Sequence, residues 1–350
     1  MTEFVGWICS YTPEEIIVAS GLLPFRILPQ REISISSSYL PSNFCPYIRR
    51  ILNSIFENST KLKGLIFVYS CDGMRRLKDV CDLYWKKGFV FGIDLPRKQD
   101  KKAEEFLLTQ FKNLKNFLES YTGKPIEDKD LWNAIQVQNK IKDLIFEIYN
   151  KIVKNESNIT LKELTNVVKE IGFRSKKEDF ISYLEDLKKD QKTLKSDLTP
   201  KPKVLIYGSV IEDLQLYEII ESCGAQVILE DSCNFLRYFD EKVSVSNSIS
   251  PLEALVKRYL YKIPCPRMTD LKKRLERILQ IYQKYKCQGI IFHSLKFCDL
   301  MSLEITRLQN HFKDLNIPFL HIEREEIPDA TGQIKTRIQA FIEMIKNERN

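Results

Sequence analysis

The spacing of hydrophobic and polar positions divides the chain into three segments. Residues 1–96 mix short apolar runs with helical stretches. The runs at 65–69 and 89–93 predict buried parallel strands, because each is continuous and bounded by glycine or charged residues. Strands that alternate with helices in this way are typical of an α/β lobe.

Residues 97–200 follow a different pattern, rich in Lys, Glu and Leu, with apolar residues at helical spacing. A break at 123–125 separates two predicted helices, and we expect Asp128 to cap the second of them. Proline and charge at 197–202 predict a linker at the end of this all-helical region.

Strand and helix patterns alternate again in residues 201–350. Strands are predicted at 204–207, 226–229, 289–292 and 318–322, and helices near 212–222, 251–260, 268–286, 299–312 and 333–347. This alternation predicts a mostly parallel sheet. The expected fold is therefore α/β, with two Rossmann- or flavodoxin-like lobes (1–96 and 201–350) and a helical region (97–200) packed on the first lobe.

Composition and charge narrow the function classes. The 350 residues are 43% hydrophobic and 29% charged, which excludes a disordered chain. The net charge of +7 suits an anionic ligand but is too small and too evenly spread to predict nucleic-acid binding. We expect no membrane partner, because no apolar run approaches the roughly 18 residues that span a bilayer. Nine cysteines without an export signal favour a reducing compartment, so a cytoplasmic location is expected.

Two common kinds of site find little support. The turn at Gly208 follows a predicted strand but lacks the glycine patterns of phosphate-binding loops, so a plain turn is the favoured interpretation. His293, His311 and His321 form no metal-binding pattern, and core or surface roles are favoured for them. Zinc is also disfavoured, because the sequence contains no CxxC pair.

The cysteines carry more information, although buried apolar packing is their simplest role. Cys45 is followed by a proline and Cys265 lies between two prolines, while Cys71 and Cys298 follow predicted strands. Sites in open parallel sheets form at the carboxyl ends of strands, so cysteines from both lobes are able to converge in the cleft between them. Converging thiolates favour an iron–sulfur cluster or zinc. The CxxC-type runs usual for clusters are missing, so metal binding and buried apolar packing both remain open as roles of these cysteines.

Segments along nearly the whole chain are similar, in the right order, to the 2-hydroxyacyl-CoA dehydratase and benzoyl-CoA reductase family, and in particular to the D-component of 2-hydroxyglutaryl-CoA dehydratase. The first is Cys9-Ser-Tyr-Thr-Pro-Glu-Glu15, which begins the segment 9–26. Each motif is modest, but the ordered set is specific. The others are 40–47, 70–77, 94–97, 224–227, 230–233, 258–267, 296–298, 317–320 and 332–341.

The resemblance implies a [4Fe-4S] cluster in the cleft between the lobes, held by Cys45, Cys71 and Cys298 with one iron left open. It also implies an ATP-dependent [4Fe-4S] activator protein, which injects one electron, and a related subunit in a homo- or heterodimer. The expected reaction is dehydration of a 2-hydroxyacyl-CoA through a ketyl radical anion. Glu15 and residues 36–38 are implied on the substrate side, although a helix N-terminal acid is an equal interpretation of Glu15.

Two alternatives remain open within the same family. Cys9, Cys233 and Cys265 also fall in the matching segments, as in the branch with a double-cubane [8Fe-9S] cluster, whose members are ATP-driven reductases of small molecules. The second alternative is a non-catalytic subunit that relays an electron or acts as a scaffold. Ordinary core packing is expected for three other cysteines, Cys81, Cys223 and Cys287. Four polar residues have two possible roles each, a contact to a CoA phosphate or a contact within the fold: Arg267, Arg337, Gln333 and Thr336.

Overall fold

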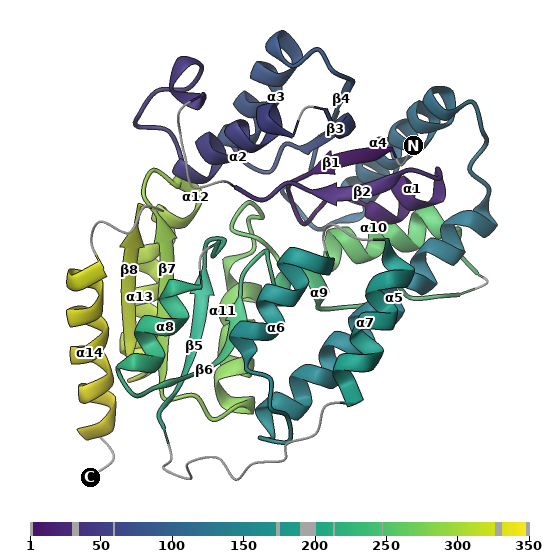
Figure 1. The fold of residues 1–350 in the computed structure, drawn as a ribbon. Coiled ribbons are helices and arrows are strands. Elements are labelled where there is room, and N and C mark those ends of the chain that lie inside the picture. The colour runs from purple at the N-terminus through teal and green to yellow at the C-terminus, as the bar shows by residue number, and fades with distance from the viewer. Residues whose placement is uncertain are drawn as a thin grey trace.

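The computed structural model describes residues 3–29, 35–58, 60–172, 176–189, 201–212, 214–246, 248–325 and 331–347. Two four-stranded parallel sheets form the centres of two lobes (Figure 1). The first contains β1 (Phe4–Trp7), β2 (Leu23–Arg26), β3 (Leu62–Val68) and β4 (Phe89–Ile93), and the second contains β5 (Lys203–Gly208), β6 (Gln226–Asp231), β7 (Gly289–Leu295) and β8 (Phe319–Arg324).

The two sheets share one topology. Their strand orders are β2-β1-β3-β4 and β6-β5-β7-β8, and every neighbouring pair is parallel. All six strands expected from the sequence are present, which confirms the α/β fold. Strands β1 and β2 were not predicted, because each has only four residues and β2 contains Pro24 and the buried Arg26. Proline is tolerated in β2 because that strand lies at the sheet edge.

Helices cover both sheets and connect them. In the first lobe they are α1 (Glu14–Ala19), η1 (Ser36–Ser38), α2 (Pro46–Glu57) and α3 (Asp72–Tyr84). The middle of the chain forms α4 (Lys101–Thr122), α5 (Asp128–Val153), α6 (Leu161–Val167), η2 (Val168–Gly172) and α7 (Lys177–Lys189). The last segment forms α8 (Gln215–Ser222), α9 (Leu236–Phe239), α10 (Pro251–Tyr261), α11 (Leu271–Lys284), α12 (Asp299–Ser302), α13 (Ile305–Asp314) and α14 (Thr331–Asn347).

The middle helices contact both lobes. Lys177 of α7 forms an ion pair with Glu14 of α1 in the first lobe, at 2.9 Å. Tyr149 of α5 donates a hydrogen bond to the carbonyl oxygen of Ile228 in β6, at 3.0 Å. Helix α10 of the last segment packs against α4, where the ring centroids of Tyr259 and Phe111 lie 5.7 Å apart (Figure 1). Because segments distant in sequence interlock here, the two lobes and the helical region share contacts rather than standing apart.

One predicted helix cap was wrong by a residue. The N-cap of α5 is Glu127, whose backbone N–H donates to Asp130 at 3.0 Å, and Asp128 is the first residue of the helix. The preceding break is confirmed, since Gly123 ends α4 with a left-handed φ of 68°. The predicted linker at 197–202 lies largely outside the described residues.

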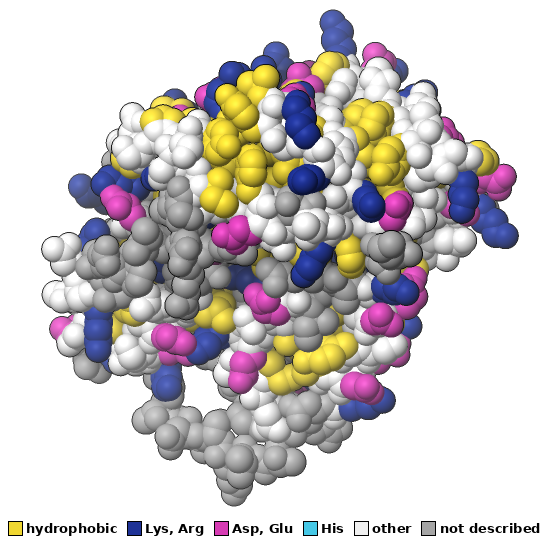
Figure 2. Space-filling view, turned by 45° about the horizontal axis from the view of Figure 1, so that its top comes forward, with side chains coloured by type: hydrophobic (Ala, Val, Ile, Leu, Met, Phe, Trp, Pro, Cys, Tyr) yellow, Lys and Arg dark blue, Asp and Glu magenta, His cyan; other side chains and the backbone are white. Residues whose placement is uncertain are grey.

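Gly208 ends β5 with a φ of +144°, and a Cβ there would lie 1.9 Å from the carbonyl oxygen of His293. Packing against β7 therefore accounts for this glycine without a phosphate ligand. Within the described part of the chain, no helix has both the length and the apolar character needed to cross a bilayer. Figure 2 shows basic and acidic side chains interspersed over one face, as the mixed charge of the sequence suggests.

Candidate functional site

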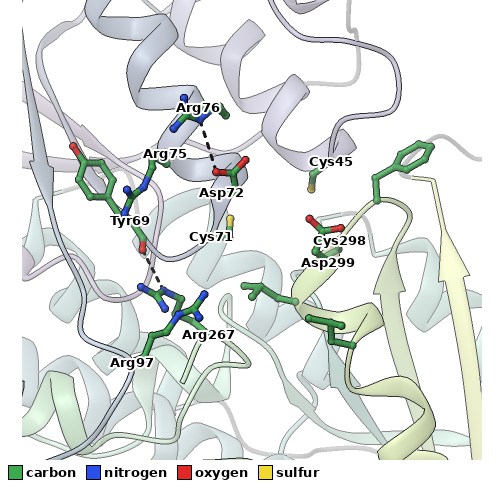
Figure 3. Close-up of a pocket in the computed structure, with 14 residues that line it drawn as sticks. Cys45, Tyr69, Cys71, Asp72, Arg75, Arg76, Arg97, Arg267, Cys298 and Asp299 are labelled. Carbon is green, nitrogen blue, oxygen red and sulfur yellow. Dashed lines mark hydrogen bonds and ion pairs between the residues drawn. The ribbon is translucent and has the colours of Figure 1, made fainter. Parts of the chain in front are cut away.

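A pocket of about 460 Å³ opens between the lobes. Cys45 and Cys71 of the first lobe and Cys298 of the second line it together (Figure 3). Strand β3 leads to Cys71, β7 leads to Cys298, and Cys45 precedes α2. The structure thus brings together, across the interlobe cleft, the three cysteines that the family resemblance implies as cluster ligands.

Each of these three cysteines is the residue that precedes a helix. Cys45, Cys71 and Cys298 are the N-caps of α2, α3 and α12. The Cys71 sulfur accepts a hydrogen bond from the backbone N–H of Met74 at 3.4 Å. Backbone N–H groups at helix starts favour negative charge, so all three thiols lie where a thiolate is stabilised.

Burial opposes that stabilisation while no metal is bound. It is the main cause that raises the pKa of Cys71 to about 12 and also raises the pKa values of Cys45 and Cys298. The charge of Cys298 raises the pKa of both other thiols, which reflects their proximity. The thiols are therefore neutral at pH 7, and a bound metal cation would be needed to deprotonate them.

The spacing of the pocket thiols does not suit one metal ion. Among the described residues, no three His, Cys, Asp or Glu side chains lie close enough together to hold such an ion. A four-iron cluster is larger than a single ion, so its ligands stand farther apart. Three thiols around a pocket of this size fit the donor set of a cluster better than that of zinc.

Arg75, Arg76, Arg97 and Arg267 line one side of the pocket (Figure 3). Arg267 donates hydrogen bonds to the carbonyl oxygens of Leu95, at 3.0 Å, and Tyr69, at 3.3 Å. Burial and the neighbouring Arg97 lower the pKa of Arg267, which places two guanidinium groups close together. Arg75 lies 4.9 Å over the ring of Tyr69. Clustered guanidinium groups of this kind favour binding of an anion.

Cys9, Cys233 and Cys265 form a second thiol group. Cys9 follows β1, Cys233 follows β6, and Cys265 lies between α10 and α11. A hydrogen bond with Cys265 is the main cause that lowers the pKa of Cys233 well below its usual value, and Arg237 contributes in the same direction. The same hydrogen bond raises the pKa of Cys265.

The two thiol groups adjoin each other. The charge of Cys9 raises the pKa of Cys71, and the charge of Cys233 raises the pKa of Cys298. Each of these pairs joins one member of the second group to one of the pocket thiols. Six of the nine cysteines therefore gather around the cleft, although the segments that carry them span most of the sequence.

The chain matches, over residues 9–345, the sequence model of a family described as 2-hydroxyglutaryl-CoA dehydratase, D-component. This chain belongs to that family. It is 25% identical to the (R)-phenyllactyl-CoA dehydratase beta subunit of Clostridium sporogenes and 26% identical to the lactoyl-CoA dehydratase subunit beta of Anaerotignum propionicum. It is 22% identical to one subunit of the benzoyl-CoA reductase of Thauera aromatica. Each alignment covers 97% or 98% of this chain and 91% of the relative.

Family membership confirms the resemblance seen in the sequence, but several residues implied by it lie elsewhere. Glu15 is buried in α1, where it accepts a hydrogen bond from Tyr259 at 2.8 Å, and it does not line the cysteine pocket. Ser36 is buried, and its backbone N–H donates to Asn53. Of the two arginines considered for a CoA phosphate, Arg267 lines the pocket and Arg337 does not.

The remaining singled-out residues have ordinary structural places. Arg337 of α14 donates a hydrogen bond to the carbonyl oxygen of His321, and Gln333 and Thr336 lie on the same helix. His293 is fully buried in β7. Cys81 and Cys287 are buried in the core, and Cys223 is half-buried at the end of α8. Core roles are confirmed for Cys81, Cys287 and His293.

Sequence reasoning missed most of the charged residues of the site. Arg75, Arg76 and Arg97 fall inside segments that match the family, and Arg75 stands one helical turn after Cys71. That spacing is a usable signal, because it places Arg75 on the same helix face as the cysteine. Arg26 and Arg237 carry no such local signal, since only the fold brings them to the second thiol group.

Proposed function

We propose that this chain is the iron–sulfur subunit of a 2-hydroxyacyl-CoA dehydratase-type enzyme, with a [4Fe-4S] cluster on Cys45, Cys71 and Cys298. The observation that carries the proposal is that these three cysteines, drawn from both lobes, line one pocket in a chain of the dehydratase family. The relatives are named as subunits of dehydratases for phenyllactyl-CoA and lactoyl-CoA, which supports this reaction class.

Local structure makes the three cysteines suitable cluster ligands. Each is held at the start of a helix, so the backbone fixes its position and its N–H groups face the sulfur or lie near it. Three protein thiolates leave one corner of a cubane free for another ligand. When bound, such a cluster supplies a single electron and a Lewis-acidic iron, which a reaction at a non-acidic β-proton requires.

The arginine-lined side of the pocket supports an acyl-CoA substrate. Arg97 and Arg267 lie side by side and create positive charge where a phosphate-bearing ligand enters the pocket. Arg267 is fixed by its two carbonyl partners, so it orients the anion without a large loss of side-chain freedom. The thioester end of the ligand then points inward, toward the cysteines.

The proposed partners are a related dehydratase subunit and an ATP-dependent [4Fe-4S] activator protein that delivers the electron. The names of the relatives support the first of these partners, because each name designates one subunit of a larger enzyme. Cys298 and the exposed Phe297 and Leu303 lie together at the pocket rim, which leaves the cysteines reachable from a protein surface.

A double-cubane [8Fe-9S] protein acting as an ATP-driven reductase is the second candidate function. Cys9, Cys233 and Cys265 favour it, because they form a coherent group that adjoins the pocket thiols through Cys71 and Cys298. Scattered core thiols would not be expected to share hydrogen bonds and cationic neighbours in this way. The similarity to a benzoyl-CoA reductase supports a reductase in the same family.

The test is anaerobic reconstitution with ferrous iron and sulfide, followed by titration with a 2-hydroxyacyl-CoA. The proposal predicts about four iron per chain and saturable thioester binding. About eight iron without thioester binding would favour the double-cubane reductase. About four iron without thioester binding would favour an electron-relay or scaffold subunit, and protein that binds no iron would contradict all catalytic versions.

A further inference from the structure

Lys262 directly follows α10 and is almost completely buried, with 1% of its surface exposed. Its ammonium donates hydrogen bonds to the carbonyl oxygen of Ser10 at 2.7 Å, to the Ser10 hydroxyl at 3.1 Å and to the carbonyl oxygen of Arg237 at 3.4 Å. It also lies 4.0 Å over the ring of Tyr11. In the described parts of the chain, no carboxylate stands within ion-pair distance of this ammonium.

Two arginines lie in the same region. Arg237 forms an ion pair with Asp231 at 2.9 Å and also donates to the Gly208 carbonyl oxygen. Arg26 crosses from β2 to the second lobe, where it donates to the carbonyl oxygen of Cys233 at 3.3 Å and to the Asn234 side chain at 2.8 Å. Both guanidinium groups are buried, and a guanidinium does not lose its proton in a protein.

These cations stand around the second thiol group. Ser10, which holds Lys262, is the neighbour of Cys9, and Arg26 binds the backbone of Cys233 itself. The charges of Arg237, Arg26 and Lys262 all act on Cys233. Within the described structure Arg237 has a carboxylate partner in Asp231, whereas Lys262 has none.

Excess positive charge in a protein interior is destabilising unless an anion compensates it. Nearby oxygens of Ser10 and Arg237 are neutral, so they solvate Lys262 but do not balance its charge. The groups in reach that are able to become anionic are the thiols of Cys9, Cys233 and Cys265. Tyr11, whose ring lies under Lys262, accepts a hydrogen bond from the backbone N–H of Cys265 at 3.3 Å, so an anionic group held by these cysteines would lie close enough to balance the charge of Lys262.

We propose that Lys262, Arg26 and Arg237 are the counter-charge for an anionic iron–sulfur unit bound by Cys9, Cys233 and Cys265. This inference rests on the double-cubane form of the proposed function and deepens it. The three cations are positioning residues, because they hold the charge of the bound unit and do not contact the substrate. Thiols that only pack in the core would not require three buried cations around them.

The test uses Lys262→Met and Lys262→Arg, with Lys142→Met as the matched control. Lys142 is equally buried and donates to the Glu241 carbonyl oxygen, but it contacts no cysteine. Burial is the main cause that lowers the pKa of Lys262 to about 7, so its ammonium is costly to keep charged in the metal-free protein. Metal-free Lys262→Met is therefore expected to unfold at the same temperature as the wild type or higher. The double-cubane form predicts about eight iron per wild-type chain after anaerobic loading with ferrous iron and sulfide. Lys262→Met should then hold about half of the wild-type iron and gain less thermal stability on loading.

Lys262→Arg should keep the wild-type iron content, since it preserves the charge, and Lys142→Met should do the same. If Lys262→Met does not fold, Lys262→Arg decides the test. A Lys262→Arg protein that folds but holds less iron than the wild type would overturn the inference. Equal iron and equal thermal gain in Lys262→Met and the wild type would overturn the inference at either four or eight iron. Wild-type protein without any iron would instead overturn the proposed function on which the inference rests.

Discussion

Cys71 and Cys298 occupy equivalent places in the two lobes. Each lies three residues beyond the last residue of the third strand of its sheet, which is Val68 in one lobe and Leu295 in the other, and each caps the helix that follows. The two sheets have the same strand order, so the fold repeats one strand–cysteine–helix unit on both sides of the cleft. The pocket is formed where these two units face each other.

Replacing Cys298 with serine should prevent stable loading of the pocket, because it removes the only one of the three predicted ligands that comes from the second lobe. We expect retention of iron to weaken at least about tenfold, since even the loss of an outer hydrogen bond has effects of that size. Iron and sulfide are measured after anaerobic gel filtration. Cys223→Ser is the control, as Cys223 is half-buried at the end of α8, away from the pocket. Equal losses in both variants would argue against the ligand assignment.

Arg97→Gln should weaken binding of a CoA thioester about tenfold, which corresponds to about 1.4 kcal/mol. The change removes one of the two adjacent guanidinium charges on the arginine-lined side of the pocket and leaves the carbonyl contacts of Arg267 in place. Calorimetric titration measures the dissociation constant. Arg337→Gln serves as the comparison, because Arg337 lies on α14 outside the pocket. If Arg337→Gln gives the larger loss, the anion site is on α14 instead.

Much of the fold was predictable because its strands and helices have clear local patterns. Strands β3 to β7 each contain a short apolar run, and α4 and α5 show long helical spacing. Strands β1 and β2 are too short for a pattern, and the buried Arg26 at the end of β2 contradicts one. Tertiary contacts override local preference at such a position.

Cys71 and Cys298 were predictable from their places after strands, and Cys45 from its proline and the family resemblance, whereas the groups that surround them were not. A thiol after a strand has a recognisable context, as Cys71 and Cys298 show. The burial of Lys262 results from contacts with Ser10 and Tyr11, which lie some 250 residues earlier in the chain. Nothing near Lys262 in the sequence marks it as buried, so only the structure identifies it.

Glu15→Ala should lower the free energy of unfolding by about 1–3 kcal/mol. Glu15 is buried and accepts the hydrogen bond of the Tyr259 hydroxyl, so its removal leaves that hydroxyl without its partner inside the protein. Urea unfolding followed by circular dichroism gives the change. Wild-type stability in this variant would show that the buried contact between α1 and α10 contributes little, and would reopen a role for Glu15 in the site.

His293 should make the protein less stable in acid. Burial and the nearby Arg324 lower its pKa from 6.5 to about 3. The unfolded chain therefore binds a proton that the folded chain excludes, so stability from this group is complete above pH 6.5 and is lost as the pH falls toward 3. The expected slope is about 1.4 kcal/mol per pH unit in that window. In His293→Leu, urea unfolding at several pH values should show a flatter dependence, and an unchanged slope would contradict the assignment.

The most direct test of the central claim is the iron and acid-labile sulfide content per chain after anaerobic reconstitution. It compares the wild type with a variant in which Cys45, Cys71 and Cys298 are all replaced by serine. The account predicts at least about four iron per wild-type chain, and a loss of about four in the triple variant. A wild-type chain that binds no iron, or a triple variant that binds as much as the wild type, would contradict it.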